Sequence, residues 1–115
     1  MQPPQVDGLA VLPELTDDAI LISNLLKAPL RGREKIARVL HALDDYFIVV
    51  SDIERINTAS HKIIDSRALL PFGGKVQIQV FGTRNDQGWI SEVLLILESD
   101  KALPQLAKII ADASH

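Results

Sequence analysis

Several carboxylates and a histidine in this sequence stand at spacings that could serve chemistry. His41 precedes Asp44 and Asp45 by three and four residues, a helical spacing at which the three side chains could bind a metal ion. They fall on the polar side of a predicted helix, so we interpret them as a solvated face and predict no metal. Asp52 and Asp65 lie on predicted strands, where a buried carboxylate could act as a base. Outward, ion-paired carboxylates are the favoured interpretation, and we expect no catalytic residue among the five.

Basic residues gather where that helix is predicted to begin. Arg31, Arg33, Lys35 and Arg38 surround its N-terminus, whose free amide groups attract anions. A phosphate or carboxylate ligand is one interpretation, and ordinary solvated charge is the favoured one. The run Gly73–Lys75 lacks the spacing of a phosphate-binding loop and leads into a strand instead of a helix.

Composition excludes several classes of protein. The 115 residues suit one hydrophobic core and contain no cysteine, which excludes a disulfide framework, a thiolate metal site and a cysteine nucleophile. The net charge of −3 and the scarcity of aromatic side chains disfavour nucleic-acid binding. The longest apolar block, Val93–Leu97, is too short to cross a bilayer. We therefore expect a cytoplasmic protein with one domain over residues 1–115, no cofactor and no membrane contact.

One strong helical pattern dominates the first half of the chain. Pro13 restricts any helix over Val6–Thr16 to about two turns, and residues 1–6 are expected to be disordered. Ala19–Ser23 is a short β-rich run, predicted to be the first strand. After Gly32, apolar residues recur at three- and four-residue spacings and predict a long helix with one buried stripe. The stripe consists of Ile36, Val39, Leu40, Leu43 and Phe47.

Four strands and a tail helix are predicted after the long helix. Short turns rich in Gly, Asn, Asp and Ser separate the strands, which indicates an antiparallel meander because parallel neighbours need long crossovers. The apolar periodicity after Ser99-Asp100 predicts a helix over residues 100–114. The predicted strands are Ile48–Ile56, Lys62–Leu70, Lys75–Gly82 and Trp89–Leu97.

The last predicted strand is apolar on both faces. Alternation puts Trp89 and Val93 on one face with Leu95 and Leu97, and it puts Ile90 on the other with Leu94 and Ile96. The chain offers little to cover the second face. A homodimer that stacks the backs of two sheets through Leu94 and Ile96 would bury it.

Three local patterns occur in an order that is typical of a known family. Asp17–Ala19 leads into the first strand, Pro29–Ile36 opens the long helix with Gly-Arg-Glu, and Arg84–Val93 forms a hairpin into the last strand. Over residues 9–98 the chain resembles the nuclear transport factor 2-like superfamily, in particular its SnoaL-like and ketosteroid isomerase branch. The resemblance implies an α+β, cystatin-like fold in which a cone-shaped, strongly bent antiparallel sheet wraps around one long helix. Here the N-terminal helix is truncated and a C-terminal helix is added.

The resemblance also locates the positions where the isomerases keep their catalytic groups. The general base corresponds to Ser23 and the oxyanion donor to Val80, while the tyrosine of the first helix has no counterpart. Neither a serine nor a valine can replace a carboxyl group in these roles. We therefore expect no isomerase activity.

A cone of this kind implies an apolar cavity with few polar groups. Two hypotheses stay open: the cavity binds a mainly apolar small molecule, or the protein is a dimeric interaction module whose cavity is filled by its own side chains. The substrate-binding residues expected under the first hypothesis are Ser23, Leu40, Tyr46, Ser66, Val80, Trp89, Ser91 and Val93.

Overall fold

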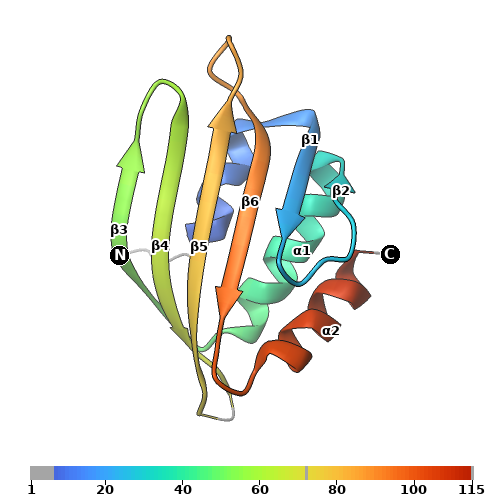
Figure 1. Cartoon of the computed structure of the whole chain (residues 1–115), viewed down its shortest axis with the longest axis vertical. Helices are drawn as coiled ribbons and strands as arrows, with labels where there is room; N and C mark the ends of the chain where they lie inside the picture. The colour runs from blue at the N-terminus through green and yellow to red at the C-terminus, as the bar shows by residue number, and fades with distance from the viewer. Residues whose placement is uncertain (1–6, 72, 115) are drawn as a thin grey trace.

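A computed structural model describes residues 7–71 and 73–114, in which six strands form one strongly curved sheet with helices on its concave side (Figure 1). The predicted disorder of residues 1–6 lies outside the described residues. The elements are η1 (Asp7–Glu14), β1 (Leu15–Ser23), β2 (Leu30–Arg31), α1 (Arg33–Tyr46), β3 (Val49–Asn57), β4 (His61–Leu69), β5 (Lys75–Arg84), β6 (Ile90–Glu98) and α2 (Leu103–Ala113).

The strand order in the sheet is β2-β1-β6-β5-β4-β3. Strands β3 to β6 form the antiparallel meander that the short turns predicted. Strand β1 adds to it in parallel, with Ile22 beside Leu94 of β6. A parallel pair needs a long connection, and here most of the chain supplies it.

Helix α1 confirms the predicted stripe, because Ile36, Val39, Leu40 and Leu43 are all buried. The helix begins after Gly32, whose φ of 112° is a conformation that side-chain-bearing residues rarely adopt. The Gly32 amide donates a hydrogen bond of 2.9 Å to the carbonyl oxygen of Ala19 in β1. This contact ties the start of the helix to the first strand.

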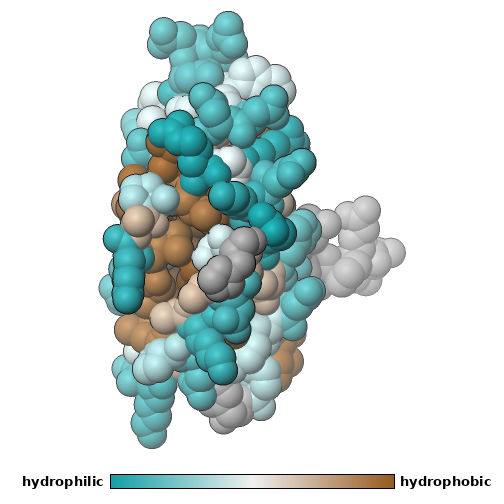
Figure 2. Space-filling view, turned by 90° about the vertical axis from the view of Figure 1, so that its right-hand side faces the viewer, coloured by the Kyte–Doolittle hydropathy of each residue, from teal (hydrophilic) through white to brown (hydrophobic). Residues whose placement is uncertain are grey.

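The two ends of the described chain close the concave side. The N-terminal element η1 is only a 3-10 helix of eight residues that contains Pro13, as the truncated start predicted. Helix α2 buries Leu106 and Ile110 and packs on α1. Seen from the side of α2, the molecule still carries hydrophobic side chains at its surface (Figure 2). Within the described part of the chain, no helix is long and apolar enough to span a bilayer.

The start of β6 departs from the simple alternation that we predicted. Trp89 is 50 % exposed, whereas Ile90 is fully buried together with Val93. The pairing with β5 shifts register between Thr83 and Arg84, and such an irregularity changes the face to which the next side chains belong. The predicted interior position of Trp89 is therefore wrong, and Ile90 occupies the interior instead.

Candidate functional site

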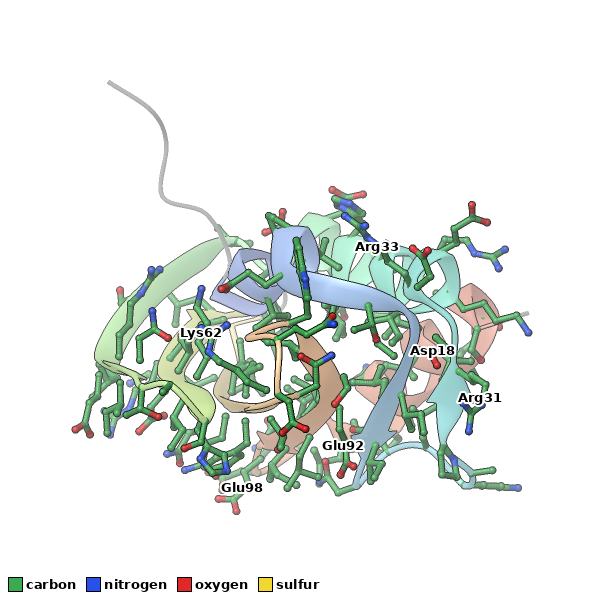
Figure 3. The ribbon with its side chains drawn as sticks, turned by 90° about the horizontal axis from the view of Figure 1, so that it is seen from above. Asp18, Arg31, Arg33, Lys62, Glu92 and Glu98 are labelled. Carbon is green, nitrogen blue, oxygen red and sulfur yellow. The ribbon has the colours of Figure 1, made fainter. Side chains whose placement is uncertain are left out.

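The concave side of the sheet is the predicted site, and it is packed with side chains. Leu40 on α1, Ser66 on β4, Val80 on β5 and Val93 on β6 all belong to the buried interior and expose between 0 and 2 % of their surface. Seen from above, the sheet curves around this interior and side chains occupy the space between it and the helices (Figure 3). The structure therefore brings these four predicted residues together in one core.

These four side chains are closely packed. A void large enough for a water molecule would give accessible surface to the residues that line it. Val80, Val93 and Ser66 have none, and Leu40 has almost none. No void of that size therefore touches these four described residues.

Among the side chains that the structure describes, Ser66 is the one polar residue with no exposed surface. Its Oγ has no hydrogen-bond partner among the described residues. The residue lies on β4 and pairs with Ile78 of β5 on one side and with Asp52 of β3 on the other. A buried hydroxyl without a partner costs roughly 1–3 kcal/mol, and each such group calls for an explanation.

Ser23, at the end of β1, stabilises the loop that follows it through a hydrogen bond. Its Oγ lies 3.3 Å from the backbone amide of Leu25 and accepts its hydrogen bond. Asn24 follows, and its side-chain amide donates to the carbonyl oxygen of Leu97 at 2.8 Å while its Oδ1 accepts from the Leu97 amide at 3.0 Å. These bonds fix the loop between β1 and β2 against the end of β6.

Three predicted site residues lie outside the packed interior. Tyr46 is half-buried at the end of α1 beside the core, and Ser91 is half-buried near the start of β6. Trp89 lies in the β5–β6 hairpin, where its backbone amide donates to Oδ1 of Asn85 at 3.1 Å. The structure therefore does not gather all eight predicted residues around one cavity.

An ion-pair cluster that the sequence analysis missed joins η1 to the sheet. Glu14 accepts hydrogen bonds from Nζ of Lys62 at 2.7 Å and from Nη1 of Arg84 at 2.8 Å. The bond from Lys62 lowers the pKa of the Glu14 carboxyl most, and Arg84 lowers it further, while partial burial opposes both.

The side chain of Arg84 is only 8 % exposed and also donates to Asn57 and to the carbonyl oxygens of Thr58 and Gly88. These hydrogen bonds from the guanidinium group join the turn between β3 and β4 to the hairpin between β5 and β6.

The metal and anion interpretations gain no support from the geometry. His41 and Asp45 are exposed on the outer side of α1, as a solvated face requires. Among the residues that the structure describes, no three His, Asp or Glu side chains stand close enough to hold a metal ion. At the start of α1, Arg31, Arg33 and Lys35 line an open hollow of about 610 Å³ in which Asp17 offsets part of their charge.

The outer face of the sheet carries an apolar row, which consists of Ile22, Leu94, Phe81, Ile63 and Ile56. The strand register places each of these residues beside the next, so the row crosses five strands from β1 to β3. Ile22 is 36 % and Ile56 41 % exposed, and the other three are half-buried. The next row on one side consists of Ile96, Gln79 and Asp65, and Figure 3 shows Glu92 and Glu98 on the same outer side.

Solved structures with the same architecture are numerous, although no protein-family model and no curated protein matches the sequence. An uncharacterised protein with a cystatin-like fold from Silicibacter pomeroyi superposes with a TM-score of 0.77 at 14 % identity, over 92 % of this chain and 74 % of that one. A steroid delta-isomerase from Pseudomonas aeruginosa gives a TM-score of 0.75 at 14 % identity, over 91 % and 77 %. A nuclear transport factor 2-like protein of unknown function from Mesorhizobium loti gives 0.64 at 16 %, over 80 % and 78 %.

This chain has the nuclear transport factor 2-like fold. The identities are too low to carry more than the fold, and one fold hosts many activities. In this nuclear transport factor 2-like chain, Ser23 and Val80 are the residues that the sequence resemblance matched to catalytic carboxyl groups. The structure gives Ser23 a loop-fixing bond and buries Val80 in the core.

Proposed function

We propose that this nuclear transport factor 2-like chain is a dimeric interaction module. Two copies would stack the outer faces of their sheets, and the interior would serve as a filled core. The absence of cysteine suits a cytoplasmic setting. The observation that supports the proposal is the apolar row from Ile22 to Ile56, which lies on a face that an isolated sheet would fill with polar groups.

The row has the dimensions of an interface core. Four inter-strand spacings make it about 19 Å long, and Ile96 widens it next to Leu94 on β6. Burying what remains exposed of each side chain contributes on the order of 1 kcal/mol. A two-fold dimer brings the same patch of both copies together, so each side chain of the row is buried once in each copy and contributes twice to the free energy of association.

Sedimentation velocity tests this proposal. The wild-type chain is expected to form a dimer at micromolar concentration, and its melting temperature should rise with protein concentration because association stabilises the native state. The double variant Leu94→Glu/Ile96→Glu should sediment as a folded monomer, since it places charges at the centre of the contact. Gln105→Glu, which adds a charge on the exposed side of α2, is the matched control and should remain dimeric. A wild-type chain that sediments as a monomer at these concentrations contradicts the proposal.

A second candidate function is the binding of a mainly apolar small molecule in the interior, and Ser66 supports it. A ligand with one polar atom would give the Ser66 hydroxyl the partner that it lacks. Because Val80 and Val93 have no exposed surface, a ligand that enters beside them would have to displace neighbouring side chains. The predicted roles of Ser23, Tyr46, Trp89 and Ser91 in binding belong to this candidate.

Thermal shifts with steroids and aromatic polyketides distinguish the two functions. A ligand that binds only the native state raises the melting temperature, and Ser66→Ala should reduce that rise if the hydroxyl is its polar anchor. Ser51→Ala, on the exposed side of β3 and outside the predicted site, serves as the comparison. An unchanged melting temperature with every compound favours the filled module.

A further inference from the structure

A groove separates the loop between β1 and β2 from helix α2. It has a volume of about 630 Å³ and lies apart from both the filled interior and the apolar row. Figure 2 faces this side of the molecule and shows a hollow whose floor is hydrophobic. The residues that line the groove are Leu25, Leu26, Lys27, Ala28, Pro29, Leu30, Ala107, Lys108, Ala111 and Ser114.

Both walls of the groove are held in place. The loop wall is fixed by the two hydrogen bonds between Asn24 and Leu97 and by the bond of 3.1 Å from the Leu26 amide to the carbonyl oxygen of Ser23. The helix wall is fixed because Leu106 and Ile110 are fully buried against the rest of the core. A groove between rigid walls costs little ordering entropy when a ligand enters.

The charge of the groove has one sign. Lys27 and Lys108 are the charged residues among its described lining, one on each wall, and that lining contains no carboxylate. Both lysines are exposed, so their ammonium groups remain hydrated, while the half-buried Leu25 and Leu26 give the groove an apolar surface. The complementary ligand has an aliphatic tail and an anionic head.

We propose that this groove binds a single-chain aliphatic carboxylate of medium length. The small side chains of Ala107, Ala111 and Ser114 follow one face of α2 and leave room for a narrow chain. Seven residues separate Ala107 from Ser114, which corresponds to about 10 Å along the helix. A tail of that length lies along the groove with its carboxylate between the two lysine ammonium groups, where each contributes a charge-assisted contact.

Decanoate, used below the concentration at which it forms micelles, is the probe for this site. In methyl-resolved NMR spectra, decanoate is expected to shift the signals of Leu25, Leu26, Leu30 and Ala111 and to leave those of Val80 and Val93 in place. Decyltrimethylammonium has the same tail and the opposite charge, and it should bind about tenfold more weakly or less. Equal affinity for the two amphiphiles would overturn the proposed role of the lysines, and shifts centred on Val80 and Val93 would overturn the site itself.

Two variants separate the tail contact from the head contact. Ala111→Leu fills the groove and should abolish the shifts, while Lys27→Glu/Lys108→Glu should reverse the preference between the two amphiphiles. Lys101→Glu, an exposed lysine outside the groove, should change neither. Since the charge-reversal variant alters only exposed side chains, it keeps the test decisive even where Ala111→Leu disturbs folding. Undiminished decanoate binding by this variant contradicts the proposal, and the outcome is independent of the oligomeric state.

Discussion

Two buried serines in this protein contribute to stability with opposite signs. Ser23 satisfies the amide of Leu25, so Ser23→Ala leaves that amide without its partner and should lower the free energy of unfolding by about 1 kcal/mol. Ser66 has no hydrogen-bond partner among the described side chains, so Ser66→Ala should remove a desolvated hydroxyl and raise the free energy of unfolding by about 1 kcal/mol. Urea unfolding of both variants at one protein concentration measures the difference. Equal losses in the two variants would show that Ser66 has a partner in solution.

At the scale of elements, the ion pairs that attach η1 to the sheet come, among its described side chains, from the carboxylate of Glu14. Glu14 binds Lys62 of β4 and Arg84 of β5, while Val11 provides the apolar contact. A 3-10 helix has poor internal hydrogen-bond geometry, so its position depends on such tertiary contacts. We therefore expect η1 to be the first described element to detach when the cluster is weakened.

The variant Glu14→Gln measures this attachment. Folding lowers the pKa of the Glu14 carboxyl from its ordinary value of 4.5. The ionised carboxylate therefore stabilises the fold at pH values above 4.5. This stabilisation is lost as the pH falls through the pKa of the folded state. At neutral pH the variant should lose about 1 kcal/mol and exchange the amide hydrogens of η1 faster. The difference from wild type should vanish below the folded pKa. Glu54→Gln, on the exposed side of β3, is the control and should show neither effect.

At the scale of the whole molecule, the sequence predicts what is local and misses what is distant. The stripe of α1, the meander from β3 to β6 and the short η1 follow from periodicity, turn chemistry and Pro13, which act over a few residues. The parallel pairing of Ile22 with Leu94 and the ion pair of Glu14 with Arg84 join residues that are about 70 positions apart. The sequence around Ile22 does not specify Leu94 as its neighbour, and the sequence around Glu14 does not specify Arg84.

The candidate site shows the same division between local and distant signals. Alternation correctly places Val80 and Val93 in the interior, but a register shift reverses Trp89 and Ile90. Whether the interior is open or filled depends on the combined volumes of side chains from several elements. The alternation of apolar and polar residues along the sequence does not give that total volume. The groove beside α2 likewise requires two segments, Leu25–Leu30 and Ala107–Ser114, that meet only in the folded chain.

The position of β1 between β2 and β6 has a consequence for biosynthesis. A ribosome makes β1 before the other described strands, whereas β6, the long neighbour that β1 needs, follows β2 to β5. Until β6 emerges, the nascent chain offers β1 only the two residues of β2, and one edge of β1 stays open to strands of other chains. This sheet can therefore be completed only after β6 has been made, and a ribosome that stalls before Ile90 leaves a product prone to aggregate.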